Sequence, residues 1–124
     1  MPAFDLEERT AVFGEAIIDF VKSTPKNAIT DVLIGQIVRC GTSVGANYCE
    51  ADDAGSKKEF RYRISIAKRE SRETRFFIRM IVRAEPSLAD TGRVLWQEAK
   101  ELNLIFGAIL RSTPRRARER AERE

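Results

Sequence analysis

Apolar residues recur along this chain at alternating spacings of four and three positions, in four segments. Pro25, Gly55 and Pro86 separate the segments, and Pro114 ends the last one. A repeat near 3.5 residues keeps one edge of an α-helix apolar along its whole length, and such helices pack at shallow angles. The short connections make consecutive helices antiparallel. The sequence therefore predicts an all-α fold, an antiparallel up-down four-helix bundle.

The 124 residues are enough for one hydrophobic core. We expect a single domain over residues 1–112, followed by a charged tail over residues 113–124. Arginine and glutamate alternate in the tail without apolar periodicity, so we expect it to be flexible, although ion pairing could extend a helix there.

Helix start signals follow two of the separators. Ser56 and Glu59 have the spacing of a capping box, in which each side chain accepts a hydrogen bond from a backbone amide at the helix start. Ser87 and Asp90 repeat this spacing more weakly after Pro86. We expect one unbroken helix over residues 56–84. Its predicted buried edge consists of Phe60, Ile64, Ala67, Ser71, Thr74, Ile78 and Ile81.

Small residues are concentrated in the second segment, at Gly35, Gly41, Gly45 and Ala46. Each interior glycine lowers the stability of a helix by roughly 1 kcal/mol, which packing must offset. We therefore expect another helix to approach this one closely. Asn47 also falls on the predicted buried edge, where a polar residue commonly fixes the register of packed helices at a cost in stability.

Charge is distributed unevenly, although the formal net charge is only +3. Residues 1–56 carry nine acidic and four basic side chains, a balance of −5, whereas residues 57–83 carry three acidic and ten basic ones, a balance of +7. On a helical wheel seven of these bases fall within about 80° of one another, in a row about 39 Å long. This basic row consists of Lys57, Arg61, Lys68, Arg72, Arg75, Arg79 and Arg83.

We expect the basic row to lie roughly opposite the buried edge and to face outward. A continuous line of cations is typical of a surface that binds RNA or DNA phosphates without sequence specificity. The alternative is that carboxylates of residues 1–56, in the same or a neighbouring subunit, pair with these bases in a structural or interaction scaffold. The sequence leaves both open.

Large apolar side chains also occur outside the predicted buried edges. Trp96 and Leu104 are two of them in the fourth segment. Four others share one flank of the third segment: Tyr62, Ile66, Phe76 and Met80. Exposed apolar patches commonly mark interfaces, so the sequence predicts a homo-oligomer with this flank at the contact. A wider monomer core that covers these side chains is the alternative.

No residue pattern typical of catalysis is found. The chain has no histidine, which excludes Ser-His-Asp triads and histidine-ligated zinc sites. Cys40 and Cys49 fall on opposite sides of one helix, so we expect two free thiols. Glu50, Asp52 and Asp53 could bind a divalent cation, but a solvated helix end explains them better. We expect no enzymatic activity, no cofactor and no metal site.

No apolar run reaches the roughly 18 residues of a membrane span, and the N-terminal residues do not form a signal segment. We therefore expect a cytoplasmic protein without a membrane partner.

Three motifs in the middle of the chain carry a family resemblance. The pattern R-x-(A/G)-x-S-(V/I)-x-x-N-x-x-E-(A/G) is matched by Arg39, Ser43, Val44, Asn47, Glu50 and Ala51. The pattern S-K-K-(E/D)-F is matched by residues 56–60, which include Ser56 and Glu59. The pattern E-(A/S)-x-E-(T/L) is matched by Glu70, Ser71, Glu73 and Thr74. Up to about Ser112 the chain resembles the 23S rRNA intervening-sequence proteins.

The resemblance implies a four-helix bundle that assembles as a homopentamer with a central opening. It also implies a connection with nucleic acid, because relatives are encoded within intervening sequences of ribosomal RNA genes. Similar bundles serve as accessory proteins of diversity-generating retroelements, so a nucleic-acid enzyme such as a reverse transcriptase is a further implied partner. No enzymatic activity is associated with the family.

Overall fold

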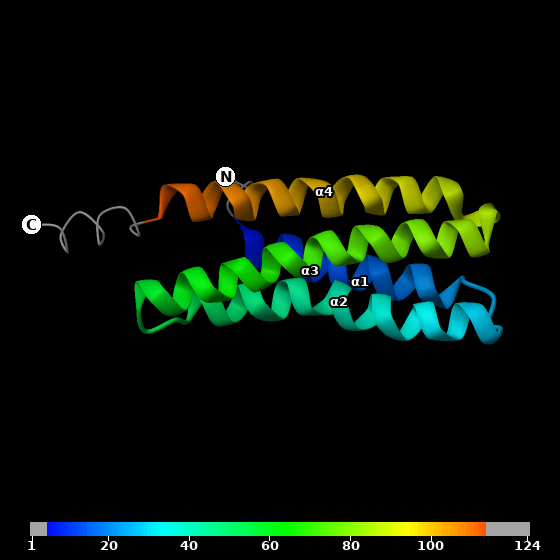
Figure 1. Ribbon diagram of the computed structural model, residues 1–124, viewed down its shortest axis with the longest axis horizontal. Helices are drawn as coiled ribbons and strands as arrows, with labels where there is room; N and C mark the ends of the chain where they lie inside the picture. The colour runs from blue at the N-terminus through cyan, green and yellow to red at the C-terminus, as the bar shows by residue number, and fades with distance from the viewer. Residues whose placement is uncertain (1–4, 114–124) are drawn as a thin grey trace, which may run out of the picture.

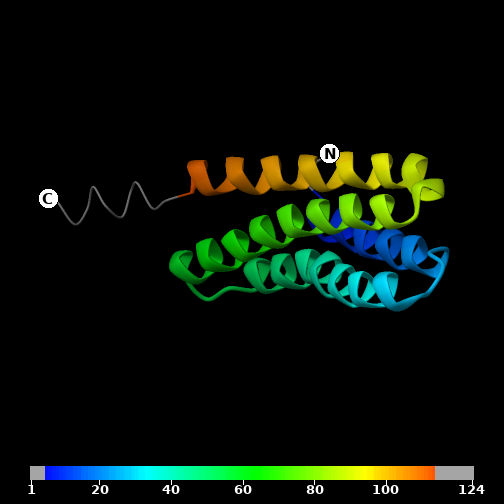
Figure 2. The same cartoon turned by 45° about the vertical axis from the view of Figure 1, so that its right-hand side comes forward.

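The computed structural model describes residues 5–113 as four long α-helices joined by short turns (Figure 1). The helices are α1 (Leu6–Lys22), α2 (Ala28–Asp52), α3 (Lys57–Ala84) and α4 (Ala89–Ser112), and a 3-10 helix, η2 (Pro86–Leu88), precedes α4. All four α-helices follow the long axis of the molecule, and consecutive helices are antiparallel (Figure 2). The predicted all-α four-helix bundle is confirmed. The predicted flexible tail lies outside the described residues except for Thr113.

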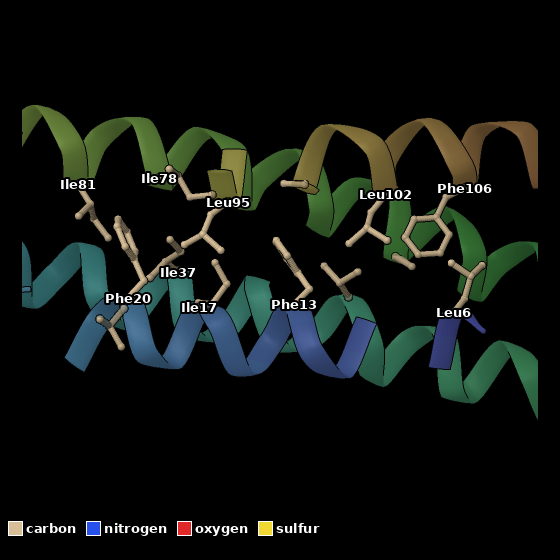
Figure 3. Packing of buried hydrophobic residues seen from close by; sticks show 14 of the residues in the cluster. Leu6, Phe13, Ile17, Phe20, Ile37, Ile78, Ile81, Leu95, Leu102 and Phe106 are labelled. Carbon is tan, nitrogen blue, oxygen red and sulfur yellow. The ribbon is translucent and has the colours of Figure 1, made fainter. Parts of the chain in front are cut away.

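The core is one continuous apolar seam to which all four helices contribute (Figure 3). Of the predicted buried edge of α3, every residue is buried except Phe60, which is half-buried. Leu6 of α1 faces Phe106 of α4 at one end of the seam, and Ile17 and Phe20 of α1 lie near Leu95 of α4 toward the other end. Ser71 and Thr74 lie on the buried edge of α3, and their hydroxyls donate hydrogen bonds to backbone carbonyls of α3 itself. The seam therefore tolerates these polar positions without unpaired groups.

α1 and α2 approach each other closely at two glycines. A Cβ atom at Gly41 would lie 3.0 Å from the side chain of Ile17. A Cβ atom at Gly45 would lie 3.1 Å from the hydroxyl of Thr10. The close packing of these helices explains why glycine is present despite its low helix propensity. The expected close approach is confirmed at both positions, whereas Gly35 faces open space.

The start of α3 follows the predicted cap with one change. The hydroxyl of Ser56 accepts a hydrogen bond from the amide of Glu59, at 3.1 Å. The carboxylate of Glu59 reaches one residue further back than expected and accepts a hydrogen bond from the amide of Gly55, at 3.1 Å. α3 then continues unbroken to Ala84, as predicted.

The predicted cap at Ser87 and Asp90 is wrong. Pro86 begins the η2 turn, and α4 starts after Leu88 without a side-chain cap. Ser87 lies inside this turn, and its hydroxyl donates to the carboxylate of Glu85 at 3.2 Å. The fixed φ of proline favours the 3-10 turn, which places the serine too early to cap α4.

Cys40 is buried and Cys49 is exposed, and neither forms a disulfide, as expected. Burial raises the pKa of the Cys40 thiol. No helix within residues 5–113 combines the length and the apolar character that crossing a bilayer requires.

A matched pair of leucines on α4 tests the core. Leu102 is fully buried, whereas Leu104 is 59% exposed. Leu102→Ala should lower the free energy of unfolding by about 2–5 kcal/mol, because it leaves a cavity in the seam. Leu104→Ala should change it by about 0.5 kcal/mol or less. Urea unfolding measures both; equal losses would contradict the orientation of α4.

The two cysteines test the burial of α2. At mildly alkaline pH, iodoacetamide should modify only Cys49 in the native protein and both thiols in urea, as counted by mass spectrometry. The thiolate is the reactive form, and burial raises the pKa of Cys40. The stability from this shift is present below the pKa of the unfolded thiol and declines as the pH rises above it. Rapid double modification of the folded protein would refute the burial.

Candidate nucleic-acid interface

The buried edge of α3 determines where the basic row lies. α3 packs against α2 on one side of this edge and against α4 on the other. The centre of the row is about 110° around the helix from the centre of the edge, which is the side occupied by α4. The expectation that the whole row faces outward, opposite the core, is therefore wrong. Four members are exposed and three are half-buried: Lys57, Arg72, Arg79 and Arg83 are exposed, and Arg61, Lys68 and Arg75 are half-buried.

Two of the half-buried bases lie against the second half of α4. Nη1 of Arg61 donates a hydrogen bond to the carbonyl oxygen of Leu110, at the negative end of the α4 dipole. Nδ2 of Asn103 donates to the carbonyl oxygen of Lys68 at 2.9 Å. The stem of Lys68 passes Gly107, where a Cβ atom would lie 3.3 Å from its Cε. These contacts hold the beginning of the row along α4.

Trp96 of α4 joins the row to further bases. The guanidinium carbon of Arg75 lies 5.1 Å from the centre of the indole ring, and Nζ of Lys100 lies 5.7 Å from it. Both distances are typical of cation–π contacts. On a wheel of α4, Arg93 and Arg111 lie within about 20° of Lys100, on the side next to α3. We call the basic row together with these three bases the basic face.

The charge count of the sequence does not reveal the bases of α4. Asp90, Glu98 and Glu101 are interspersed with them, so residues 84–112 have almost no net charge. A helical wheel of residues 89–112 contains the signal, since it separates these acids from Lys100. Only the position of α3 beside α4 shows that the two sets of bases form one face.

Four carboxylates of α3 and α4 form ion pairs away from the basic row. Glu70 and Glu73, on the α2 side of α3, both pair with Arg39 of α2. Glu70 is 8% exposed, and its oxygen lies 3.2 Å from Nη1 of Arg39. Glu73 forms the other contact with this guanidinium. One guanidinium thus engages two acids of the most basic helix on the side away from the basic row.

The same arrangement recurs on α4. Glu98 and Glu101 pair with Arg9 of α1, at 2.8 and 3.1 Å. The hydrogen bond to Glu98 raises the pKa of Arg9 above its already high value. No member of the basic row forms an ion pair with a carboxylate of residues 5–113. On the basic face, Arg93 pairs with Asp90 at 3.2 Å, and both side chains are largely exposed.

Several residues of the family motifs form contacts within α2 or between α2 and α3. The ion pairs of Arg39 with Glu70 and Glu73 join the first motif to the third. The hydroxyl of Ser43 donates to the carbonyl oxygen of Arg39 at 2.7 Å. Asn47 is half-buried; its Nδ2 donates to the carbonyl oxygen of Ser43 at 3.0 Å, and its Oδ1 accepts from Arg63 at 3.4 Å. Asn47 therefore links α2 to α3. Glu50 is exposed, and nothing in the structure explains its place in the motif.

The predicted interface flank lies on the α2 side of α3. Tyr62 and Phe76 are 59% and 55% exposed, so the core of the chain does not cover them. Ile66 and Met80 are half-buried. α2 extends this surface with two further exposed apolar side chains, Ile29 and Val32. The molecule thus presents an apolar flank beside the basic row on α3, with their centres about 100° apart on the helix.

Within residues 5–113, no group of three or more acidic or cysteine side chains is placed to hold a metal ion. Glu50, Asp52 and Asp53 are all exposed at the end of α2.

Comparisons with known proteins relate this geometry to a family. A family model described as 23S rRNA-intervening sequence protein matches residues 4–108. A solved structure, of a protein of unknown function from the S23 ribosomal protein family of Bacteroides thetaiotaomicron, is similar with a TM-score of 0.76 and 24% identity. The match covers 86% of this chain and 98% of that chain, and at this identity it shows the fold alone. A search of curated proteins found no match. The extent of the family match shows that the chain belongs to the 23S rRNA-intervening sequence protein family.

Proposed function

We propose that this protein is a non-enzymatic, cytoplasmic binding protein for RNA or DNA and that it binds phosphates through the basic face of α3 and α4. The observation that carries this proposal is the separation of charge around α3. Seven cations share one side of the helix, whereas Glu70 and Glu73 lie on another side and pair with Arg39 of α2. A row of uncompensated cations attracts a polyanion and is screened by salt.

Exposed acidic side chains on α1 also favour binding of a polyanion at α3 and α4. Glu8, Glu15 and Asp19 are exposed on α1, which lies away from the basic row. A polyanion is repelled by this side and attracted by the other, so the field of the molecule orients it toward α3 and α4. The family description refers to 23S rRNA, which favours RNA as the polyanion.

The second candidate function is an assembly scaffold, and the exposed apolar flank of α2 and α3 favours it. The family resemblance implies a homopentamer, in which five copies would bring together a formal charge of about +15, five times the +3 of one chain. A partner that processes nucleic acid, such as a reverse transcriptase, would bind this assembly. Self-association through the flank and nucleic-acid binding through the basic face use neighbouring surfaces of α3, and the basic face extends onto α4, away from the flank.

A closed ring needs two different, complementary surfaces on each subunit. The second surface is the open groove between α1 and α4. Its floor is apolar, with Ala16, Phe20 and Val94, and Asp19 and Asp90 lie at its rim. We propose that the apolar flank of one subunit contacts this groove of the next.

Substitution of two exposed arginines of the basic row tests nucleic-acid binding. Arg72→Gln with Arg79→Gln should weaken the binding of a labelled RNA in fluorescence anisotropy at low salt. It should also reduce the slope of log K against log salt by roughly 2, about one per lost phosphate contact.

The matched control is Lys22→Gln with Lys26→Gln, which removes the same charge from exposed positions at the C-terminal end of α1 and in the turn that follows it. This control should keep the salt slope. An equal effect of both double variants would mean that only net charge matters, and it would remove the basic face as the binding surface.

Light scattering tests the apolar flank. Tyr62, Phe76 and Met80 replaced together by serine should lower the molar mass toward that of one chain, since the contact loses its buried apolar area. Leu104→Ser, at an exposed position of α4 outside this flank, should leave the molar mass unchanged. An unchanged mass in the triple variant would exclude the flank as the subunit contact.

A further inference from the structure

A hollow of about 260 Å³ opens on the basic face where α3 ends and α4 begins. Ile78 and Val82 line it from α3, and Ala89, Gly92 and Trp96 line it from α4. Gly92 brings the helices close together, because a Cβ atom there would lie 2.5 Å from Val82. The floor is therefore aliphatic, with an indole at one end.

Two arginines stand at the rim of this hollow. Arg79 belongs to α3 and Arg93 to α4, and both side chains are exposed. The partner of Arg93 is Asp90, in an exposed pair that contributes little and can exchange for a phosphate. An apolar floor between two guanidinium groups matches a ligand with a flat, weakly polar ring and negative charges on both sides of it.

The indole ring of Trp96 borders this hollow. Arg75 and Lys100 contact the ring of Trp96, but neither of them lines the hollow. Lys100 follows Trp96 by about one turn of α4, whereas Ala89, Gly92 and Arg93 all precede it. Neither cation is therefore among the residues that line the hollow beside the indole.

We propose that this hollow accepts an unpaired nucleobase of a single-stranded nucleic acid, with Arg79 and Arg93 binding the phosphates on either side of that base. This inference rests on the proposed function and specifies its ligand: a duplex keeps its bases stacked inside and cannot supply one to the hollow. Contact of a base with an aromatic side chain is typically worth about fivefold to 100-fold in affinity. Single strands are then preferred over duplexes.

Trp96 is the single tryptophan of the chain, so its fluorescence reports on the hollow. The full-length protein is titrated with a labelled single-stranded RNA, the corresponding DNA, an abasic strand of the same length and an RNA duplex. Anisotropy gives the affinity and tryptophan emission gives the contact. We expect the single-stranded RNA and DNA that carry bases to bind about fivefold to 100-fold more tightly than the abasic strand. Only these two ligands should change the tryptophan emission; the abasic strand and the duplex should not. The RNA and DNA arms show which sugar is preferred.

Ala89→Phe fills the hollow without changing the charge, and Ala108→Phe adds the same ring at an exposed position of α4 outside it. Ala89→Phe should reduce the affinity for single-stranded RNA to that for the abasic strand, and Ala108→Phe should behave like the unmodified protein. Circular dichroism checks that both variants fold. The comparison of RNA with abasic strand in the unmodified protein does not depend on either variant.

Equal affinity of the unmodified protein for RNA and abasic strands would overturn the base-binding hollow while leaving phosphate binding by the basic face intact. A preference for bases that persists in folded Ala89→Phe would overturn it as well. Failure to bind any of the four ligands at low salt would remove the proposed function itself.

Discussion

Burial of the apolar edge of α3 between α2 and α4 is the constraint on which the rest of the structure depends. This edge fixes the rotation of the helix about its own axis, because a shift of one residue would turn it by about 100° and bring arginines into the core. With the rotation fixed, every other side chain of α3 has a defined direction. The cations face α4 and the solvent beside it, and Tyr62 and Phe76 lie on the side of α2.

The ion pairs of this bundle matter more for the distribution of charge than for stability. The guanidinium groups of Arg9 and Arg39 are partly exposed, and exposure to water weakens the contribution of an ion pair to folding. Their consequence is that Glu70, Glu73 and Glu98 are held in ion pairs away from the basic face. The helix with the most bases thus keeps an uncompensated positive side, although the chain as a whole is only slightly basic.

The sequence predicted the helices well, because the spacing of apolar residues reports directly which edge of each helix is buried. The unbroken α3 and its buried residues from Ile64 to Ile81 follow from that spacing alone. A wheel gives angles within one helix but not the side on which a neighbour packs. For that reason the half-buried state of Arg75, its contact with Trp96 and the hollow beside this indole required the positions of both helices. The predicted cap of α4 was wrong because Pro86 begins a 3-10 turn that contains Ser87, so α4 starts after Leu88.

Photo-crosslinking of single-stranded RNA to the full-length protein, followed by peptide mapping, tests most directly whether the positive side of α3 and α4 is the binding surface. We predict crosslinks in peptides that cover residues 68–83 and 93–100, with none in the α1 peptide over residues 8–19. Crosslinks concentrated in α1, or at Tyr62 and Ile66 of the apolar flank, would contradict the proposed surface.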